Sequence, residues 1–271
     1  MALVDKIIWQ IETHLDDPLS LNTLADRCAV NVHHMARAFQ LRTGHSVMGY
    51  TRARRLSKAA RAIADGERDL IQVALTAGYG SHAAFTRAFS AAYGIAPSAV
   101  RSVGHLPDNM MEPFPMSQAN PTQIAAPDIR ERAAFRVVGF ETLCKDRDIS
   151  AIPGLWQQLG VRLADFGGPA PETYGVSTDA TPEGDFRYMA GMECDTVPEG
   201  ATTLTVPAGR YAVFTLTGHI ADLPPLIAAI WDHGLNDLGL TPANAPEFER
   251  YDHRFDPIQG RGTLEIWIPV N

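Results

Sequence analysis

An internal repeat is the feature that most limits what the N-terminal part of this chain can fold into. Arg37-Ala38-Phe39 recurs 50 residues later as Arg87-Ala88-Phe89, and Gly44 recurs as Gly94. Each copy holds an apolar helical stretch, a short turn, a second helical stretch and a glycine stop; the stretches are 21–28 with 32–41, and 71–77 with 82–92. Two copies are too few for a solenoid. The pattern predicts two helix-turn-helix units.

Local signals support the boundaries of these helices. Asn31 and Ser81 stand where the N-caps of the second helices are expected, and Gly78 supplies the turn in the second copy. A longer helix over about 46–64 is expected to join the two units. It would pack through one apolar face, made of Tyr50, Ala53, Leu56, Ala60 and Ile63.

The second helix of such a unit enters the major groove of DNA and buries its opposite face. A spacing of four places Met35 with Phe39, and Phe85 with Phe89, in the core. The expected DNA-facing residues are Val32, His33, Ala36, Arg37, His82, Ala83, Thr86 and Arg87. Arg37 and Arg87 are the best base readers, because a bidentate arginine–guanine pair contributes about 1 to 3 kcal/mol of discrimination. Candidate phosphate contacts on the joining helix are Arg52, Arg54 and Arg55; the alternative is that they form a solvated helix face.

The charge is divided unevenly along the chain. Residues 1–105 carry 12 Lys+Arg and 8 Asp+Glu, a net charge of +4, whereas residues 106–271 carry 11 and 23, a net charge of −12. The basic part suits contact with phosphates, and the acidic part suits a cationic partner. The three cysteines are widely spaced and odd in number, which argues against a disulfide framework and a CxxC metal site and favours a reducing cytoplasm. The charges within residues 1–17 argue against a membrane span there.

A proline-rich segment separates two domains. Residues 106–123 contain Pro107, Pro113, Pro115 and Pro121 and have no apolar periodicity, so we expect domains at 1–105 and 124–271 with a linker between them. The second domain holds helical stretches near Leu155 and Leu226. Its β-rich runs are 136–140, 174–178, 186–193, 203–206, 211–217 and 263–269. This mixture predicts an α+β domain.

A looser repeat in this domain has an offset of 75 residues: Arg136-Val137-Val138 is answered by Tyr211-Ala212-Val213, and Trp156 by Trp231. Two strand-helix-strand-strand copies would give an antiparallel sheet with helices on one face and the other face open. Alternation along residues 263–269 then turns Glu265 and Trp267 to that open face. A carboxylate beside aromatic rings suits a lipophilic cation. The other candidate ligand residues are Trp231, Glu249, Tyr251, Tyr188 and Trp156; alternatively, Glu265 faces water and the tryptophans are core.

Residues 3–101 strongly resemble the AraC/XylS DNA-binding domain. The matching elements are Pro18-Leu19-Ser20-Leu21, Thr43-Gly44, Arg54-Arg55-Leu56, Gly78-Tyr79 and Phe85-Thr86-Arg87-Ala88-Phe89. The resemblance implies an all-α domain of about seven helices with two reading helices. His33 and Ala83 depart from the tryptophan and glutamine that the short, monomeric members often have there.

Residues 126–270 look like the GyrI-like effector-binding domain. The shared elements are Pro207-Ala208-Gly209-Arg210-Tyr211, Phe248-Glu249-Arg250-Tyr251 and Leu264-Glu265-Ile266-Trp267-Ile268. The resemblance implies an aromatic-lined cleft that binds amphipathic, often cationic compounds through a glutamate, here Glu265. The order of the two domains resembles the Rob-like subgroup of AraC regulators.

These observations favour a cytoplasmic transcription regulator that binds promoter DNA and is controlled by a small-molecule effector, with RNA polymerase as a further partner. Two alternatives stay open for the second domain, a small-molecule hydrolase and a protein-interaction surface. The sequence shows no GxSxG, HExxH or paired-carboxylate motif, so we expect no enzyme activity, cofactor or metal.

Overall fold

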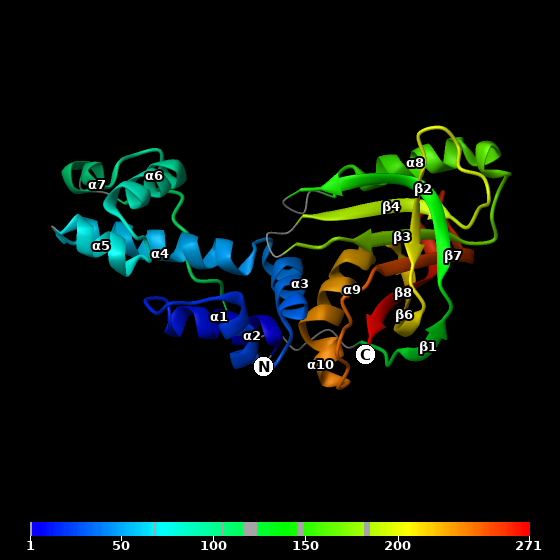
Figure 1. Ribbon diagram of the computed structural model, residues 1–271, viewed down its shortest axis with the longest axis horizontal. Helices are drawn as coiled ribbons and strands as arrows, with labels where there is room; N and C mark the ends of the chain where they lie inside the picture. Colours follow the sequence, from blue (N-terminus) through cyan, green and yellow to red (C-terminus); the bar gives the residue numbers. More distant parts are fainter. Residues whose placement is uncertain (1, 68, 104–105, 116–123, 146–148, 182–184) are drawn as a thin grey trace. The chain divides into compact units, whose positions relative to one another are not determined.

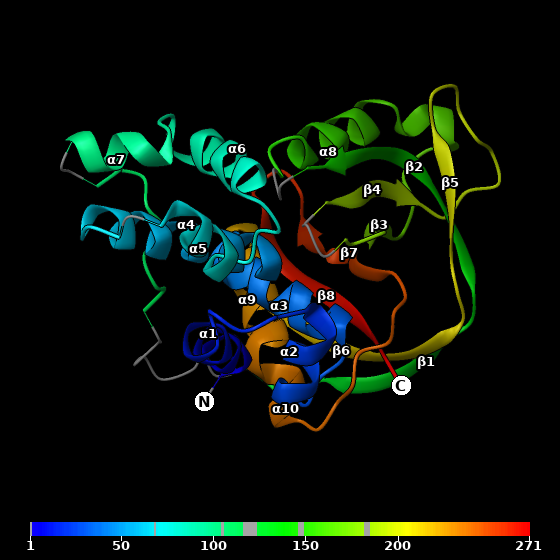
Figure 2. The same ribbon diagram turned by 60° about the vertical axis from the view of Figure 1, so that its left-hand side comes forward.

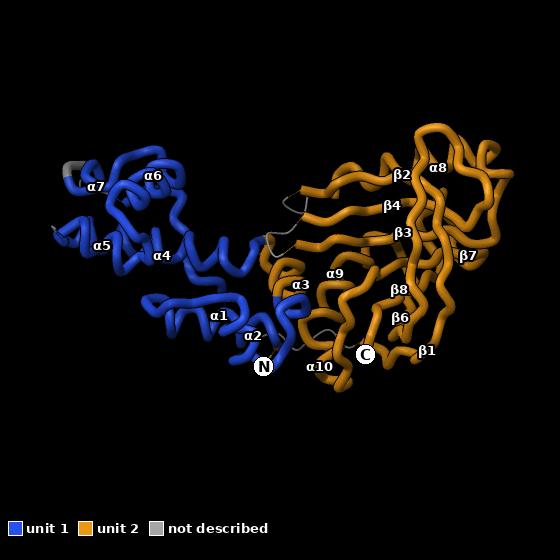
Figure 3. The backbone as a smooth tube through the Cα atoms, in the orientation of Figure 1, with its two compact units in different colours: residues 1, 3–35, 45–118 blue, residues 2, 36–44, 119–271 orange. Residues whose placement is uncertain are grey.

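The computed structural model describes residues 2–67, 69–103, 106–115, 124–145, 149–181 and 185–271. It divides into two compact units (Figure 3). The first unit is built mainly from residues 3–35 and 45–118, and the second from residues 36–44 and 119–271. Within the described residues, no helix is both long and apolar enough to cross a bilayer.

The predicted helices are present in the N-terminal part of the chain (Figure 1). They are α1 (Leu3–Thr13), α2 (Leu21–Cys28), α3 (Val32–Thr43), α4 (Val47–Ala64), α5 (Leu70–Thr76), α6 (His82–Tyr93) and α7 (Pro97–Val103). Ser81 caps α6 by accepting a hydrogen bond from the backbone N–H of Ala84. Gly44 and Gly94 follow α3 and α6 with φ of 79° and 71°, a conformation that favours glycine. The repeat therefore folds as two helix-turn-helix units.

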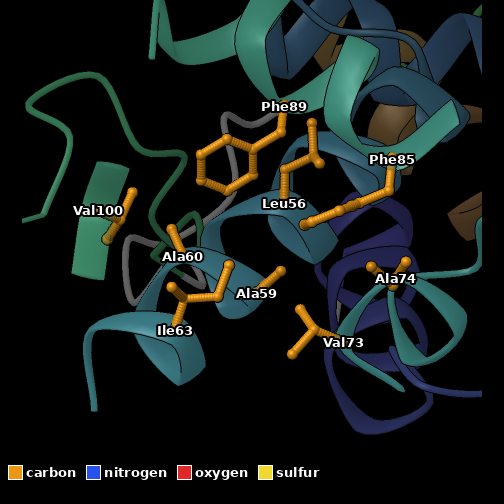
Figure 4. Close-up of a cluster of buried hydrophobic side chains, with 10 residues drawn as sticks. Leu56, Ala59, Ala60, Ile63, Val73, Ala74, Phe85, Phe89 and Val100 are labelled. Carbon is orange, nitrogen blue, oxygen red and sulfur yellow. The ribbon is translucent and has the colours of Figure 1, made fainter. Parts of the chain in front are cut away.

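The core of the second helix-turn-helix unit forms where α4, α5, α6 and α7 meet (Figure 4). Phe85 and Phe89 of α6 are fully buried, as their spacing predicts, and their rings lie 5.4 Å apart. Leu56 and Ile63 supply the α4 side of this core. The core holds α6 by one face only, and its opposite face is left to solvent.

The second unit is built on an eight-stranded antiparallel sheet in the order β1-β6-β8-β7-β3-β4-β2-β5. The strands are β1 (Asp128–Arg132), β2 (Phe135–Cys144), β3 (Thr173–Thr178), β4 (Phe186–Met192), β5 (Thr202–Val206), β6 (Gly209–His219), β7 (Glu247–Asp256) and β8 (Arg261–Val270). The helical segments are α8 (Ile152–Val161), η1 (Leu163–Phe166), η2 (Ile220–Asp222), α9 (Leu223–Ala229), η3 (Ile230–Gly234) and α10 (Leu235–Asp237). The sheet curls into a half-barrel (Figure 2).

The element order contains two strand-helix-strand-strand modules, β2-α8-β3-β4 and β6-α9-β7-β8. They meet at the centre of the sheet, where β3 pairs with β7. The edge strand β1 precedes the first module in the chain but pairs with β6 of the second module. The edge strand β5 precedes the second module but pairs with β2 of the first. This exchange ties the two modules into one sheet.

One expectation about the sheet is wrong: the face opposite the helices is not open. It holds a buried cluster of Tyr174, Tyr211, Phe248 and Trp267 with aliphatic neighbours. The rings of Phe248 and Trp267 stack at 5.3 Å, and the Arg132 guanidinium lies over the Phe135 ring at 4.0 Å. Because the sheet curls, aromatic side chains from both modules meet and exclude water from this face.

Candidate DNA-reading helices and ligand site

On the second reading helix, α6, His82, Ala83 and Arg87 are exposed, as the sequence predicts. Thr86 differs from the prediction, because it is half-buried and its hydroxyl oxygen is buried. Their positions lie opposite the buried Phe85 and Phe89. This face is therefore free to approach a base edge or a phosphate.

The first reading helix, α3, differs from this expectation in part. Val32 and His33 are half-buried, whereas Ala36 and Arg37 are both only 8% exposed, so the predicted exposure of these two residues is wrong. The physical reason is that residues 36–44 cluster with the second unit. There the Arg37 guanidinium forms an ion pair with Glu247 and lies 5.4 Å from the centre of the Phe186 ring.

The three candidate phosphate contacts on α4 differ in burial and in their hydrogen-bond partners. Arg54 is buried and donates from Nε and one Nη to the two carboxylate oxygens of Glu12, both at 2.9 Å. Arg55 donates to the backbone carbonyls of Leu15 and Asp17 at 2.8 and 2.5 Å. Both arginines tie α4 to residues 12–17, at the end of α1 and just after it. Of the three candidates, only Arg52 is exposed.

The helix-facing side of the sheet brings together four of the predicted ligand residues, which we call the Glu249 cluster: Glu249, Tyr188, Tyr251 and Trp156. The Tyr188 hydroxyl donates to Glu249 Oε2 at 2.6 Å, and the Tyr251 hydroxyl donates to the same oxygen at 3.4 Å. Trp156 of α8 donates from Nε1 to the Tyr188 hydroxyl at 3.1 Å, and its ring meets that of Tyr251 edge-on at 4.9 Å. The cluster is a carboxylate surrounded by aromatic side chains.

The electrostatics of Glu249 are unusual for a carboxyl group. It is 8% exposed, and burial raises its pKa to about 7, with the charge of Glu247 adding to the rise while the Tyr188 hydrogen bond opposes it. Burial and the charge of Glu249 also raise the pKa of Tyr188 well above its usual value, so its hydroxyl stays protonated and keeps donating. Glu249 is therefore poised to change charge near neutral pH.

A glycine makes room for this arrangement. Gly175 of β3 lies opposite Glu249 of β7 in the sheet, on the same face. A Cβ at position 175 would lie 2.0 Å from the Tyr188 hydroxyl and 2.2 Å from Glu249 Oε2. Sequence reasoning did not identify Gly175, because its role depends on a register between strands that are far apart in the chain.

Trp231, another aromatic candidate, lies in η3 and contacts the first residue of strand β7. It is fully buried, and its Nε1 donates to Glu247 Oε2 at 3.0 Å. Glu247 and Glu249 are two residues apart, so they share one face of β7. Glu247, which forms the ion pair with Arg37, was not among the predicted site residues.

Glu265 and Trp267, the other two predicted ligand residues, lie apart from the Glu249 cluster. In β8 they pair with Arg250 and Phe248 of β7, which places them on the opposite face of the sheet. Glu265 accepts hydrogen bonds from Arg250 at 2.7 Å, Arg254 at 3.0 Å and the Trp267 indole at 3.0 Å. Burial opposes ionisation of Glu265, but these donors lower its pKa overall. The arginines of the neighbouring strand β7 thus supply a countercharge to Glu265, whose role as the ligand carboxylate stays a prediction.

Comparison with known proteins decides the family. Residues 125–271, more than half of the chain, match the GyrI-like small molecule binding domain. The chain belongs to the GyrI-like family. Residues 24–102 match a helix-turn-helix domain. Together the two matches confirm the resemblance to Rob-like AraC regulators, and the chain is a transcription regulator with a DNA-binding and a small-molecule-binding domain.

Three relatives illustrate the relationship. The transcriptional regulator BrlR of Pseudomonas aeruginosa is 36% identical over 153 residues, which cover 52% of this chain and 54% of BrlR. The transcriptional regulator Rob of Salmonella typhimurium is 26% identical over 287 residues, covering 98% of this chain and 96% of Rob. The right origin-binding protein of Escherichia coli is 27% identical over 288 residues, with the same coverage. The chain thus spans about half the length of BrlR and nearly all of the other two.

Within the GyrI-like domain, two buried glutamates are candidates for the ligand carboxylate. Glu249 and Glu265 both stand in β-strands beside aromatic residues, and the sequence motifs around them look equally suitable. The signal that separates them is the set of neighbouring arginines. Arg250 and Arg254 lie on the same face as Glu265 and satisfy it, whereas the neighbours of Glu249 are tyrosines.

Proposed function

We propose that this regulator responds to an amphipathic organic cation whose charge is bound by Glu249. The observation that carries the proposal is the environment of this carboxylate. It is buried, and among the described residues its hydrogen-bond donors are two tyrosine hydroxyls rather than an arginine or lysine. A buried carboxylate without an arginine or lysine hydrogen-bond donor is a group that a cationic ligand can satisfy.

The aromatic residues determine the rest of the ligand chemistry. Trp156, Tyr188 and Tyr251 surround the carboxylate with π-faces and apolar edges, and a cation over such a ring gains about 0.5 to 2 kcal/mol. An organic cation with apolar groups satisfies both features. An anion of the same shape would meet an uncompensated carboxylate and is expected to be rejected.

DNA contact is proposed for the outer face of α6 through His82, Ala83, Thr86 and Arg87, with Arg52 as a phosphate contact. Val32 and His33 of α3 extend the proposed reading surface. Ala36 and Arg37 join it in a state that exposes their side chains. Promoter binding then changes the access of RNA polymerase, the further partner in this proposal.

The test compares ions of one shape and opposite charge. Binding of tetraphenylphosphonium and tetraphenylborate to the full-length protein is measured by titration calorimetry and by thermal stabilisation. We expect the cation alone to bind and to stabilise, by about 2.7 kcal/mol at a concentration 100 times its Kd. Glu249→Gln should abolish this effect and Glu265→Gln should retain it. Equal binding of both ions, or unchanged cation affinity in Glu249→Gln, would contradict the proposal.

A further inference from the structure

The residues next to the Glu249 cluster already hold a cation that belongs to the chain itself. Arg37 and Glu247 form an ion pair in which the side chains are only 8% and 13% exposed. Arg42 of the same segment donates to Asp232 at 2.9 Å. Two arginines of residues 36–44 thus engage two carboxylates of the same compact unit.

The surroundings of Arg37 have the chemistry expected for an organic cation. Its guanidinium lies over the Phe186 ring at 5.4 Å, and the carboxylate it pairs with also accepts the Trp231 indole N–H at 3.0 Å. Glu247 shares a face of β7 with Glu249. The positive charge of Arg37 also acts to lower the pKa of Glu249, which places the guanidinium within electrostatic range of both carboxylates.

We propose that Arg37 is an internal competitor for the effector: an organic cation at Glu249 and Glu247 displaces residues 36–44 and frees Arg37 to read DNA. This inference rests on the proposed function, because it requires a cationic effector at the same residues. Reciprocity then demands that the cation raise DNA affinity and that DNA raise cation affinity by the same factor. Because the cation and Arg37 compete for the same carboxylates, the coupling between ligand and DNA needs no further chain of residues.

The second repeat supplies a matched control. Arg87 occupies in α6 the position that Arg37 occupies in α3, 50 residues earlier, yet Arg87 is exposed. Removing either arginine removes the same charge from the same place in a reading helix. Only Arg37 should affect the affinity for a cation.

The first measurement is therefore the affinity of the full-length protein for tetraphenylphosphonium in Arg37→Ala and Arg87→Ala. We expect Arg37→Ala to bind the cation roughly 5-fold more tightly or better, the lower end of typical coupling between sites, and Arg87→Ala to match the wild type. Equal affinities in the wild type and both variants would overturn the competition while leaving the proposed function intact. Absence of cation binding from all three proteins would refute both.

A second measurement reads the same competition through DNA. The duplex is one that the wild-type protein selects from random sequence in the presence of tetraphenylphosphonium, and affinity is measured without the cation. Glu247→Gln releases Arg37 from its carboxylate and should raise DNA affinity roughly 5-fold or more, whereas Glu131→Gln, at an exposed glutamate of the same unit, should not. A DNA affinity that Glu247→Gln leaves unchanged would show that Arg37 is not held back.

Discussion

Replacing Glu249 by glutamine should change how the stability of the protein depends on pH. Burial raises the pKa of Glu249 to about 7 from an ordinary value of 4.5. Between these two values the folded protein holds a proton that the unfolded chain has released. The free energy of unfolding therefore falls as the pH rises through this interval, and the full loss is reached above pH 7. Glutamine has the same shape but cannot ionise, so it removes this fall.

The size of the effect follows from the shift. A change in pKa from 4.5 to about 7 corresponds to roughly 3 kcal/mol, of which roughly 2 to 3 kcal/mol is expressed between pH 5 and pH 8. Arginine hydrogen bonds lower the pKa values of Glu172 and Asp252 to about 2, so these carboxylates titrate below this window. Their contribution has the opposite sign, since it is lost only as the pH falls through their low pKa values.

The assay is urea unfolding of the wild type and Glu249→Gln at pH 5 and pH 8, followed by tryptophan fluorescence. Three of the four tryptophans, Trp156, Trp231 and Trp267, lie in residues 119–271 and report on that unit. Between pH 5 and pH 8, the free energy of unfolding of the wild type should fall by roughly 2 to 3 kcal/mol relative to that of Glu249→Gln. Glu265→Gln is the control, because it removes a carboxylate whose arginine partners lower its pKa. This variant should be less stable than the wild type at both pH values. Parallel pH dependence in the wild type and Glu249→Gln would refute the reasoning.

The remaining predictions concern single side chains. Gly175→Ala should weaken tetraphenylphosphonium binding about tenfold or more, because its Cβ would lie 2.0 Å from the Tyr188 hydroxyl, whereas Gly154→Ala, which meets nothing within 4 Å, should not. Arg54→Ala should cost about 3 kcal/mol in urea unfolding, because it leaves Glu12 without its buried partner, and exposed Arg52→Ala should change stability by less than about 0.5 kcal/mol. Arg87→Ala should reduce discrimination between the selected duplex and a scrambled one by about 1 to 3 kcal/mol in a binding titration, whereas Arg52→Ala should weaken both duplexes equally.

The helices of the N-terminal part could be predicted from the sequence nearly to the residue. Expected boundaries of 21–28 and 82–92 became α2 (Leu21–Cys28) and α6 (His82–Tyr93). Helices of this kind are specified by local signals, namely caps such as Ser81 and apolar residues spaced by three and four. The burial of Arg37 could not be predicted in this way, because its carboxylate partner lies 210 residues away in the sequence.

Two strands were missed for a related reason. Strands β1 (Asp128–Arg132) and β7 (Glu247–Asp256) are rich in charged residues, which are rare in strands taken alone. In the folded protein Arg250 of β7 forms ion pairs with Glu172 and Glu265, which belong to other segments of the chain. Local propensity contains no information about such partners. The residue pattern therefore did not predict strand β7, although Glu249 in that strand was a candidate ligand residue.

Glu265 and Glu249 differ in their neighbours in a way that strand alternation does not reveal. Alternation along β8 placed Glu265 and Trp267 correctly on one face, but it did not reveal that the curled sheet closes that face with arginines and aromatic rings. Both glutamates are buried beside aromatic side chains. The fold supplies the countercharge to one through Arg250 and Arg254 and leaves the other to tyrosine hydroxyls. In residues 106–271, whose net charge is −12, the buried carboxylate that has no arginine hydrogen-bond donor is the one for which an incoming cation has the most to gain.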